Sequence, residues 1–91
     1  MRKLVLTNQF RGDLKTVRKR GLDRSQLDTV IDMLQRDVKL PDKYLDHGLS
    51  GQYFGIRECH IQPGWLLLYT LADDILILIL QRTGSHSDLF R

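Results

Sequence analysis

The sequence predicts a single α+β domain over residues 1–91, in which a helical hairpin packs on a mainly antiparallel sheet in the order β-α-α-β-β-β. Two stretches with helical spacing of apolar residues lie in the first half, and three strand-like stretches joined by short turns fill the second. The length of 91 residues allows one small core. A two-domain enzyme with a separate cofactor domain is therefore excluded.

The first elements are predicted as a strand followed by a helix. Residues 2–6 have the composition of a short strand, and the side chain of Thr7 or Asn8 can cap a helix that follows. The apolar face of this helix is formed by Phe10, Leu14 and Val17. Gly21 is expected to end it, because glycine adopts the left-handed conformation without strain.

A second helix is predicted after a very short link, so the two helices should form an antiparallel hairpin. Asp23 and Gln26 resemble a capping box at its start. Its apolar stripe consists of Leu27, Val30, Ile31, Leu34 and Val38. Pro41 is expected to end the helix, because proline disfavours helical backbone at the residue before it.

The second half is predicted as a meander of three strands. Residues 41–52 have loop composition. The strands are expected over residues 53–61, 65–71 and 75–82. Turns are expected at Pro63–Gly64 and Asp73–Asp74. Apolar residues point to both faces of the last strand, so we expect helices on one face and the C-terminal tail or a partner chain on the other.

Charge is distributed unevenly along the chain. The net charge is +3, but residues 1–20 hold seven basic residues and one acid, Asp13, which leaves the remainder at −3. A basic first fifth indicates a surface that faces a polyanion. The alternative is an ordinary solvated helix face, and charge alone does not distinguish RNA, DNA and an acidic protein.

The composition also indicates the cellular compartment of the protein. The chain has a single cysteine, Cys59, which excludes an internal disulfide and a cysteine-based zinc cluster and indicates a reducing environment. Cys59 is expected to be a small apolar residue of the core. The longest apolar run, residues 75–80, is far shorter than the ~20 residues of a membrane-spanning helix. The N-terminus lacks the pattern of a signal peptide. We therefore expect a soluble, intracellular protein without a membrane partner.

The three histidines, His47, His60 and His86, are the candidates for chemistry. Each lies in a loop or at a strand end, where side chains can meet over one surface of a small sheet. Together with Arg57 or Arg82 they suit phosphodiester cleavage. Histidine can take or donate a proton near neutral pH, and arginine binds phosphate with a fixed fork of donors.

Other interpretations of these residues stay open. Each histidine can be a structural or surface residue, and Trp65 can be a core aromatic or a base-stacking one. Phe90 can cover the sheet or stack on a base. Three converging histidines could bind zinc, although the sequence offers no acids obviously placed to orient the rings. We expect no metal and no cofactor.

Three motifs then indicate a family. Asp-His-x-Leu at 46–49, Arg-Glu-Cys-His-Ile-x-Pro-x-Trp at 57–65 and Arg-Thr-Gly-Ser-His-x-x-Leu-Phe at 82–90 occur in this order. The chain thereby resembles, over essentially its whole length, the YafQ-type toxins of the RelE/ParE superfamily. The resemblance implies a RelE-like fold and a bacterial, cytoplasmic toxin of a type II toxin–antitoxin system.

Such toxins enter the ribosomal A site and cut mRNA without metal, using the 2′-OH of the RNA as nucleophile. The resemblance assigns the general acid to His86, transfer of the 2′-OH proton to His60 with His47, phosphate binding to Arg82 and base positioning to Phe90. Trp65 and Arg57 join the substrate-binding set. Lys15, Arg18 and Lys19 of the first helix would contact ribosomal RNA.

Implied partners are the 70S ribosome, mRNA and a DinJ-like antitoxin, with operator DNA reached only through the antitoxin. One position departs from the family pattern. Where the family usually has aspartate before the tryptophan, this chain has Gly64. Loss of an acid–base group typically costs about 10²–10⁴-fold in rate, so an attenuated RNase is expected. Alternatively, the glycine simply serves the turn.

Two other functions remain in view. The chain could be a catalytically weak or inactive binding module that acts through antitoxin pairing and operator repression, a hypothesis that Gly64 supports. It could instead be a ParE-like gyrase inhibitor on the same fold, although that role requires a binding surface and gives no reason for three histidines.

Overall fold

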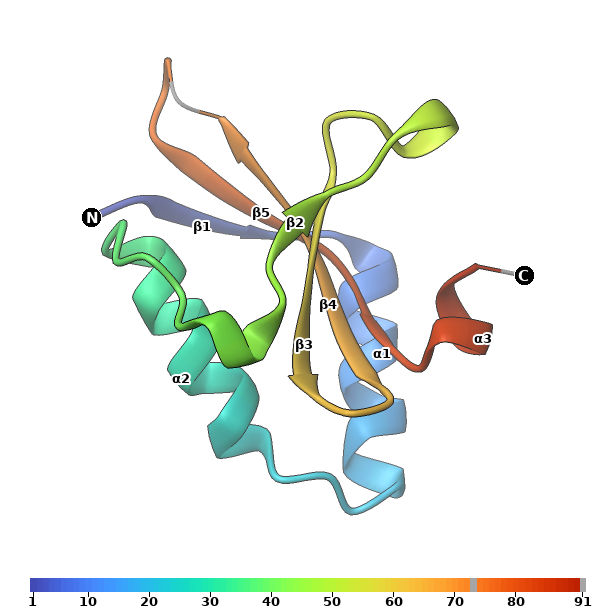
Figure 1. Ribbon diagram of the computed structural model, residues 1–91. Coiled ribbons are helices and arrows are strands. Elements are labelled where there is room, and N and C mark those ends of the chain that lie inside the picture. The colour runs from blue at the N-terminus through green and yellow to red at the C-terminus, as the bar shows by residue number, and fades with distance from the viewer. Residues whose placement is uncertain (73, 91) are drawn as a thin grey trace.

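In the computed structural model, which describes residues 1–72 and 74–90, the two long helices pack on one face of a five-stranded sheet and a short C-terminal helix packs on the other (Figure 1). The elements are β1 (Lys3–Leu6), α1 (Asn8–Lys19), α2 (Arg24–Gln35), η1 (Asp42–Tyr44), β2 (His47–Gly48), η2 (Gly51–Tyr53), β3 (Arg57–Gln62), β4 (Trp65–Ala72), β5 (Ile77–Gly84) and α3 (His86–Leu89). The sheet order is β1-β5-β4-β3-β2; the β1–β5 pair is parallel, and the other three pairs of the described strands are antiparallel. The predicted α+β class and mainly antiparallel sheet are confirmed.

Local capping signals determine where the helices begin. The Thr7 hydroxyl accepts a hydrogen bond from the Phe10 N–H (3.0 Å), and the Asp23 carboxylate accepts one from the Ser25 N–H (3.0 Å). Gly21 follows α1 with φ +69°, as predicted. The two helices run in opposite directions from a shared short link (Figure 1), α1 against β5 and α2 against β3.

The predicted end of the second helix is wrong. α2 stops at Gln35, well before Pro41, and Asp37 takes the left-handed conformation with φ +56°. Val38 therefore lies beyond the helix and is 43% exposed instead of continuing the apolar stripe. The chain turns here because Asp is one of the residues that tolerates positive φ with least strain.

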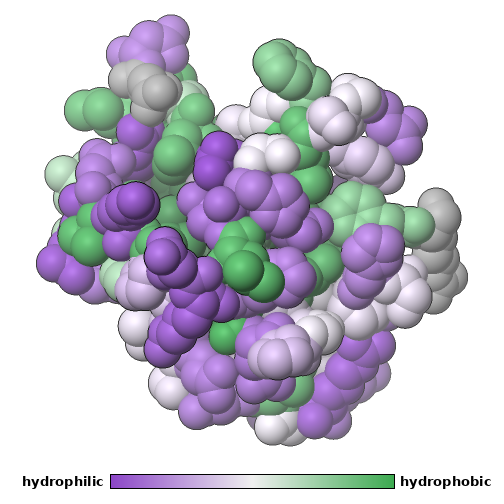
Figure 2. Space-filling view, viewed as in Figure 1, coloured by the Kyte–Doolittle hydropathy of each residue, from purple (hydrophilic) through white to green (hydrophobic). Residues whose placement is uncertain are grey.

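The strands of the second half are shifted from their predicted bounds. β3 begins at Arg57, because residues 51–53 form the 3₁₀ turn η2, and β5 begins at Ile77. Ile75 and Leu76 are exposed at the β4–β5 turn, and apolar side chains show at that tip in Figure 2. The predicted Asp73–Asp74 turn includes Asp73, which lies outside the described residues.

The core has two parts, one on each face of the sheet. The larger lies under α1 and α2 and contains Phe10, Leu27, Leu67 and Tyr69 among its fully buried members. The smaller cluster, Leu66, Leu68 and Leu89, is covered by α3 and by the loop around β2. The second face is predicted to be partly covered by the C-terminal tail or by a partner chain, and in this chain Leu89 and Phe90 of the tail pack on it.

Candidate active site

Three polar side chains, His47, Glu58 and Arg82, lie in one row across the sheet face that carries the smaller cluster. The registers pair His47 of β2 with Glu58 of β3, Glu58 with Leu68 of β4, and Leu68 with Arg82 of β5. Directly paired residues point to the same face. The adjacent row runs from His60 through Leu66 to Gly84, which places the Cα atoms of His60 and Gly84 about 10 Å apart.

Glu58 joins two of the histidines. One oxygen of its carboxylate, Oε1, lies 3.4 Å from Nε2 of His47 and 3.4 Å from Nε2 of His60. The Glu58 side chain is only 10% exposed, whereas those of His47 and His60 are 50% and 30% exposed. A nearly buried carboxylate therefore lies between two accessible imidazoles, at contacts slightly longer than ordinary hydrogen bonds.

The orientation of His47 is fixed by a second contact. Its Nδ1 lies 2.7 Å from the Leu45 carbonyl oxygen. Because a carbonyl only accepts, Nδ1 carries the proton, and Nε2 is the atom directed at Glu58. Sequence analysis missed Glu58 as a site residue and placed His47 in a loop, whereas the two-residue strand β2 brings it beside β3.

A bulge in β5 directs Arg82 onto this face. Leu80 pairs with Tyr69 and Arg82 with Leu68, so Gln81 is an extra residue between them. Leu80 packs in the larger core, and without the bulge Arg82 would point to that same face. The extra residue turns Arg82 to the histidine face.

Arg82 is held by Asp13 of α1. Nε and Nη2 of Arg82 donate to the two Asp13 oxygens at 2.8 and 3.0 Å, and the Thr83 N–H donates to Asp13 at 3.0 Å. The Asp13 hydrogen bond raises the pKa of Arg82 above its ordinary value, so the guanidinium stays charged. Asp13 is the only acid among the first 20 residues, and sequence analysis gave it no role.

The third histidine lies at the start of α3. His86 follows the N-cap Ser85 and is exposed, and its ring centroid lies 4.9 Å from that of Phe90. Tyr53 of η2 meets Phe90 edge-on at 5.2 Å. Phe90 is thus anchored against the smaller cluster but remains half-buried.

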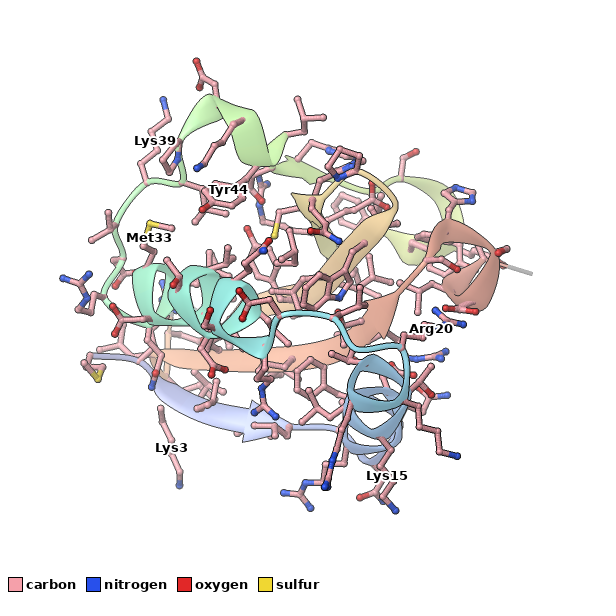
Figure 3. The ribbon with its side chains drawn as sticks, turned by 90° about the horizontal axis from the view of Figure 1, so that it is seen from below. Lys3, Lys15, Arg20, Met33, Lys39 and Tyr44 are labelled. Atoms are coloured by element: carbon pink, nitrogen blue, oxygen red, sulfur yellow. The ribbon has the colours of Figure 1, made fainter. Side chains whose placement is uncertain are left out.

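An ion pair ties α3 to α1. Nη1 and Nη2 of Arg20 donate to the two Asp88 oxygens at 2.7 and 3.2 Å, and Figure 3 shows Arg20 directed from α1 toward α3. Through this hydrogen bond Arg20 lowers the pKa of Asp88 well below its ordinary range.

Two residues of the predicted site lie elsewhere. Arg57 pairs with Tyr69, on the helix-covered face, and donates to Asp46 at 3.1 Å, so it does not join the histidines. Trp65 is 2% exposed, and its indole N–H donates to the Thr83 hydroxyl at 2.9 Å. The ring is therefore a core residue with no face open to a base, and its inclusion among substrate-binding residues is wrong for this structure.

Gly64 occupies the β3–β4 turn at φ +83°, in the left-handed region that favours glycine. A Cβ built on Gly64 meets no atom within 4 Å, so a side chain here would extend into open space. The presence of glycine at position 64 is therefore explained by the backbone conformation and not by a lack of room for a side chain.

The basic residues Lys15, Arg18 and Lys19 are exposed on α1, and Figure 3 shows Lys15 pointing away from the body of the molecule. Within residues 1–72 and 74–90, no group of three or more His, Cys, Asp or Glu side chains is arranged to hold a metal ion. Over the same residues, no helix is long and apolar enough to cross a membrane.

Comparisons with known proteins give a consistent result. A family model described as "Bacterial toxin of type II toxin-antitoxin system, YafQ" matches residues 2–91. The mRNA interferase toxin YafQ of Escherichia coli K12 is 36% identical over 90 residues, which cover 98% of this chain and 96% of that protein.

Solved structures of the same kind superpose over nearly the whole chain. In the E. coli DinJ–YafQ complex, the matched chain is 35% identical, with a TM-score of 0.90 and full coverage of both chains. A metal-bound toxin from Helicobacter pylori is 39% identical, with a TM-score of 0.93 and coverage of 99% of this chain and 100% of the other.

Proposed function

The chain belongs to the YafQ family of toxins from bacterial type II toxin–antitoxin systems, and from this premise we propose that it is an endoribonuclease that cleaves mRNA in the ribosomal A site. The observation that carries the proposal is the nearly buried Glu58 carboxylate held between His47 and His60, in the same row as the charged Arg82. This arrangement supplies proton transfer and phosphate binding on one accessible face.

In the proposed reaction, the 2′-OH of the RNA attacks the adjacent phosphorus and the 5′-oxygen of the next nucleotide leaves. His60 takes the 2′-OH proton, and Glu58 stabilises the imidazolium that forms, because an adjacent carboxylate favours the charged ring. His47 lies against the same carboxylate and can share this role.

Arg82 binds the phosphate and offsets the negative charge that develops on it. His86, exposed on α3, protonates the leaving oxygen. Phe90 is held by Tyr53 and positions a base beside His86. The exposed basic residues of α1, Lys15, Arg18 and Lys19, contact ribosomal RNA through phosphates, which gives affinity without sequence readout.

The partner in the cell is a DinJ-like antitoxin, because the related E. coli toxin was solved in complex with DinJ. The antitoxin carries the contact with operator DNA, and the toxin acts in the bacterial cytoplasm, where its ribosomal target lies. The metal-bound H. pylori toxin makes metal dependence a question to be tested for this chain.

Cleavage of a defined mRNA on programmed ribosomes tests this proposal. The wild-type protein should cut the mRNA with and without EDTA and leave a 2′,3′-cyclic phosphate or a 3′-phosphate. An mRNA with a 2′-deoxy nucleotide at the scissile position should resist. His86→Ala should lower cleavage far more than antitoxin affinity, and equal losses in both would show that His86 is structural.

The competing function is a toxin fold retained for antitoxin pairing, with catalysis weakened or lost at Gly64. Glycine can neither transfer a proton nor orient a histidine, and the open space beside Gly64 is where the family acid would lie. Cleavage by Gly64→Asp but not by the wild type would favour this reading.

A further inference from the structure

We propose that Asp13 is a positioning residue for Arg82. The Asp13 carboxylate binds one edge of the Arg82 guanidinium, and the other edge then faces the scissile phosphate. This inference rests on the proposed function, in which Arg82 is the phosphate-binding group. It assigns a role in the cleavage reaction to α1, the helix whose other polar residues face outward.

The hydrogen-bond pattern leaves a free fork on Arg82. A guanidinium carries five N–H donors. Asp13 accepts from Nε and from one hydrogen of Nη2, at 2.8 and 3.0 Å. Three donors remain, two on Nη1 and one on Nη2, and the parallel pair between these nitrogens matches two phosphate oxygens. Asp13 therefore orients Arg82 without blocking it.

Asp13 is itself held in place. It lies in the middle of α1, is 14% exposed and accepts a third hydrogen bond from the Thr83 N–H at 3.0 Å. Thr83 is buried and fixed through Trp65. The carboxylate thus ties α1 to β5 at the residue directly after Arg82, so the guanidinium has few alternative positions.

The chain also shows why Arg82 needs a support. Its side chain is 29% exposed, and a free arginine side chain samples many rotamers. Misplacement of a catalytic contact by about 1 Å can cost on the order of 10²-fold in rate. Asp13→Asn keeps an acceptor for Thr83 but removes the charge and one of the two matched oxygens.

A double-mutant cycle tests the proposal in the ribosome cleavage assay. Asp13→Asn should lower kcat by about 10- to 100-fold with little change in KM, because the basic face of α1 is untouched. In an Arg82→Ala background, Asp13→Asn should have no further effect. Asp32→Asn is the matched control, since Asp32 pairs with Arg36 on an exposed face of α2, and it should leave kcat unchanged.

Several outcomes overturn the proposal. Losses from Asp13→Asn and Arg82→Ala that multiply would show that Asp13 does not act through Arg82. A higher activity of Asp13→Asn would show that Asp13 masks the arginine. Thermal unfolding of each variant shows whether it is folded at the assay temperature, and kcat is compared only among variants that are folded.

A second readout separates this inference from the proposed function. In NMR spectra of the wild type, the Arg82 Nε–H signal should be resolved and should shift on titration with a short RNA carrying a 2′-deoxy nucleotide, whether or not the protein cleaves on ribosomes. Asp13→Asn should broaden this signal and weaken the titration at least several-fold. An unchanged signal and affinity in Asp13→Asn would refute the role of Asp13 even if the wild type is an RNase.

Discussion

Replacement of glycine by alanine should change the stability of the protein in opposite directions at Gly64 and at Gly12. A Cβ built at either position meets nothing within 4 Å, so a prediction from space alone would treat them alike. Their backbones differ, because Gly64 has φ +83° in the β3–β4 turn whereas Gly12 lies inside α1. We expect Gly64→Ala to destabilise the protein and Gly12→Ala to stabilise it.

The magnitudes follow from the backbone. A residue with a Cβ in the left-handed region costs about 1–2 kcal/mol, and glycine inside a helix costs about 0.5–1 kcal/mol relative to alanine. In a chain of 91 residues, a change of about 1 kcal/mol in the free energy of unfolding shifts Tm by about 4–8 °C. Gly64→Ala should therefore melt several degrees below the wild type and Gly12→Ala a few degrees above it.

Thermal unfolding followed by circular dichroism measures both shifts under one condition. Gly64→Asp belongs in the same series, because aspartate tolerates positive φ better than alanine and should lose less stability. If Gly64→Ala is as stable as the wild type, the turn does not require glycine and the strain argument fails.

Three further predictions concern buried or paired groups. Thr83→Val removes the acceptor of the Trp65 indole N–H and should lower the free energy of unfolding in urea by about 1–3 kcal/mol; an unchanged midpoint and slope would contradict this. Burial raises the pKa of Cys59 to about 12, so a thiol reagent at pH 8 should modify it only when urea unfolds the chain, and fast labelling of the native protein would contradict this. Arg20 lowers the folded-state pKa of Asp88 below its ordinary 3.8. The Arg20–Asp88 pair therefore stabilises the folded protein fully above about pH 4, and this stabilisation is lost as the pH falls through the lowered pKa of Asp88. The Tm gap between wild type and Asp88→Asn should accordingly be present at pH 7 and narrow below pH 4, and a gap that widens in acid would contradict the pairing.

Local chemistry explains which parts of the fold the sequence could predict. Thr7 and Asp23 cap helices through contacts with residues two or three positions away, so the information lies within one turn of chain. The end of α2 carries no such marker, since Asp37 takes positive φ without glycine or proline. Strand β2 is not predictable from local sequence, because its two residues pair with β3 across the eight residues 49–56.

The site could be predicted in its residue types but not in its contacts. The chemistry of His60 and Arg82 marks them as candidates, yet the alternation of residues along β5 gives no sign of the bulge that turns Arg82. Glu58 could have been found, because it precedes His60 by two residues in a strand and so shares its face. Asp13 also had a signal, since it lies three residues after Phe10 on the apolar face of α1, where an acid needs a partner.

Cleavage of a defined mRNA on programmed ribosomes by the wild type, with Glu58→Gln beside it, tests the central claim most directly. Glu58→Gln keeps the size of the side chain but removes the negative charge beside His60, so its cleavage rate should fall at least about tenfold. The wild type should cut with its present residues, more slowly than Gly64→Asp. Absence of cleavage by both the wild type and Gly64→Asp, or equal rates for the wild type and Glu58→Gln, would contradict the account.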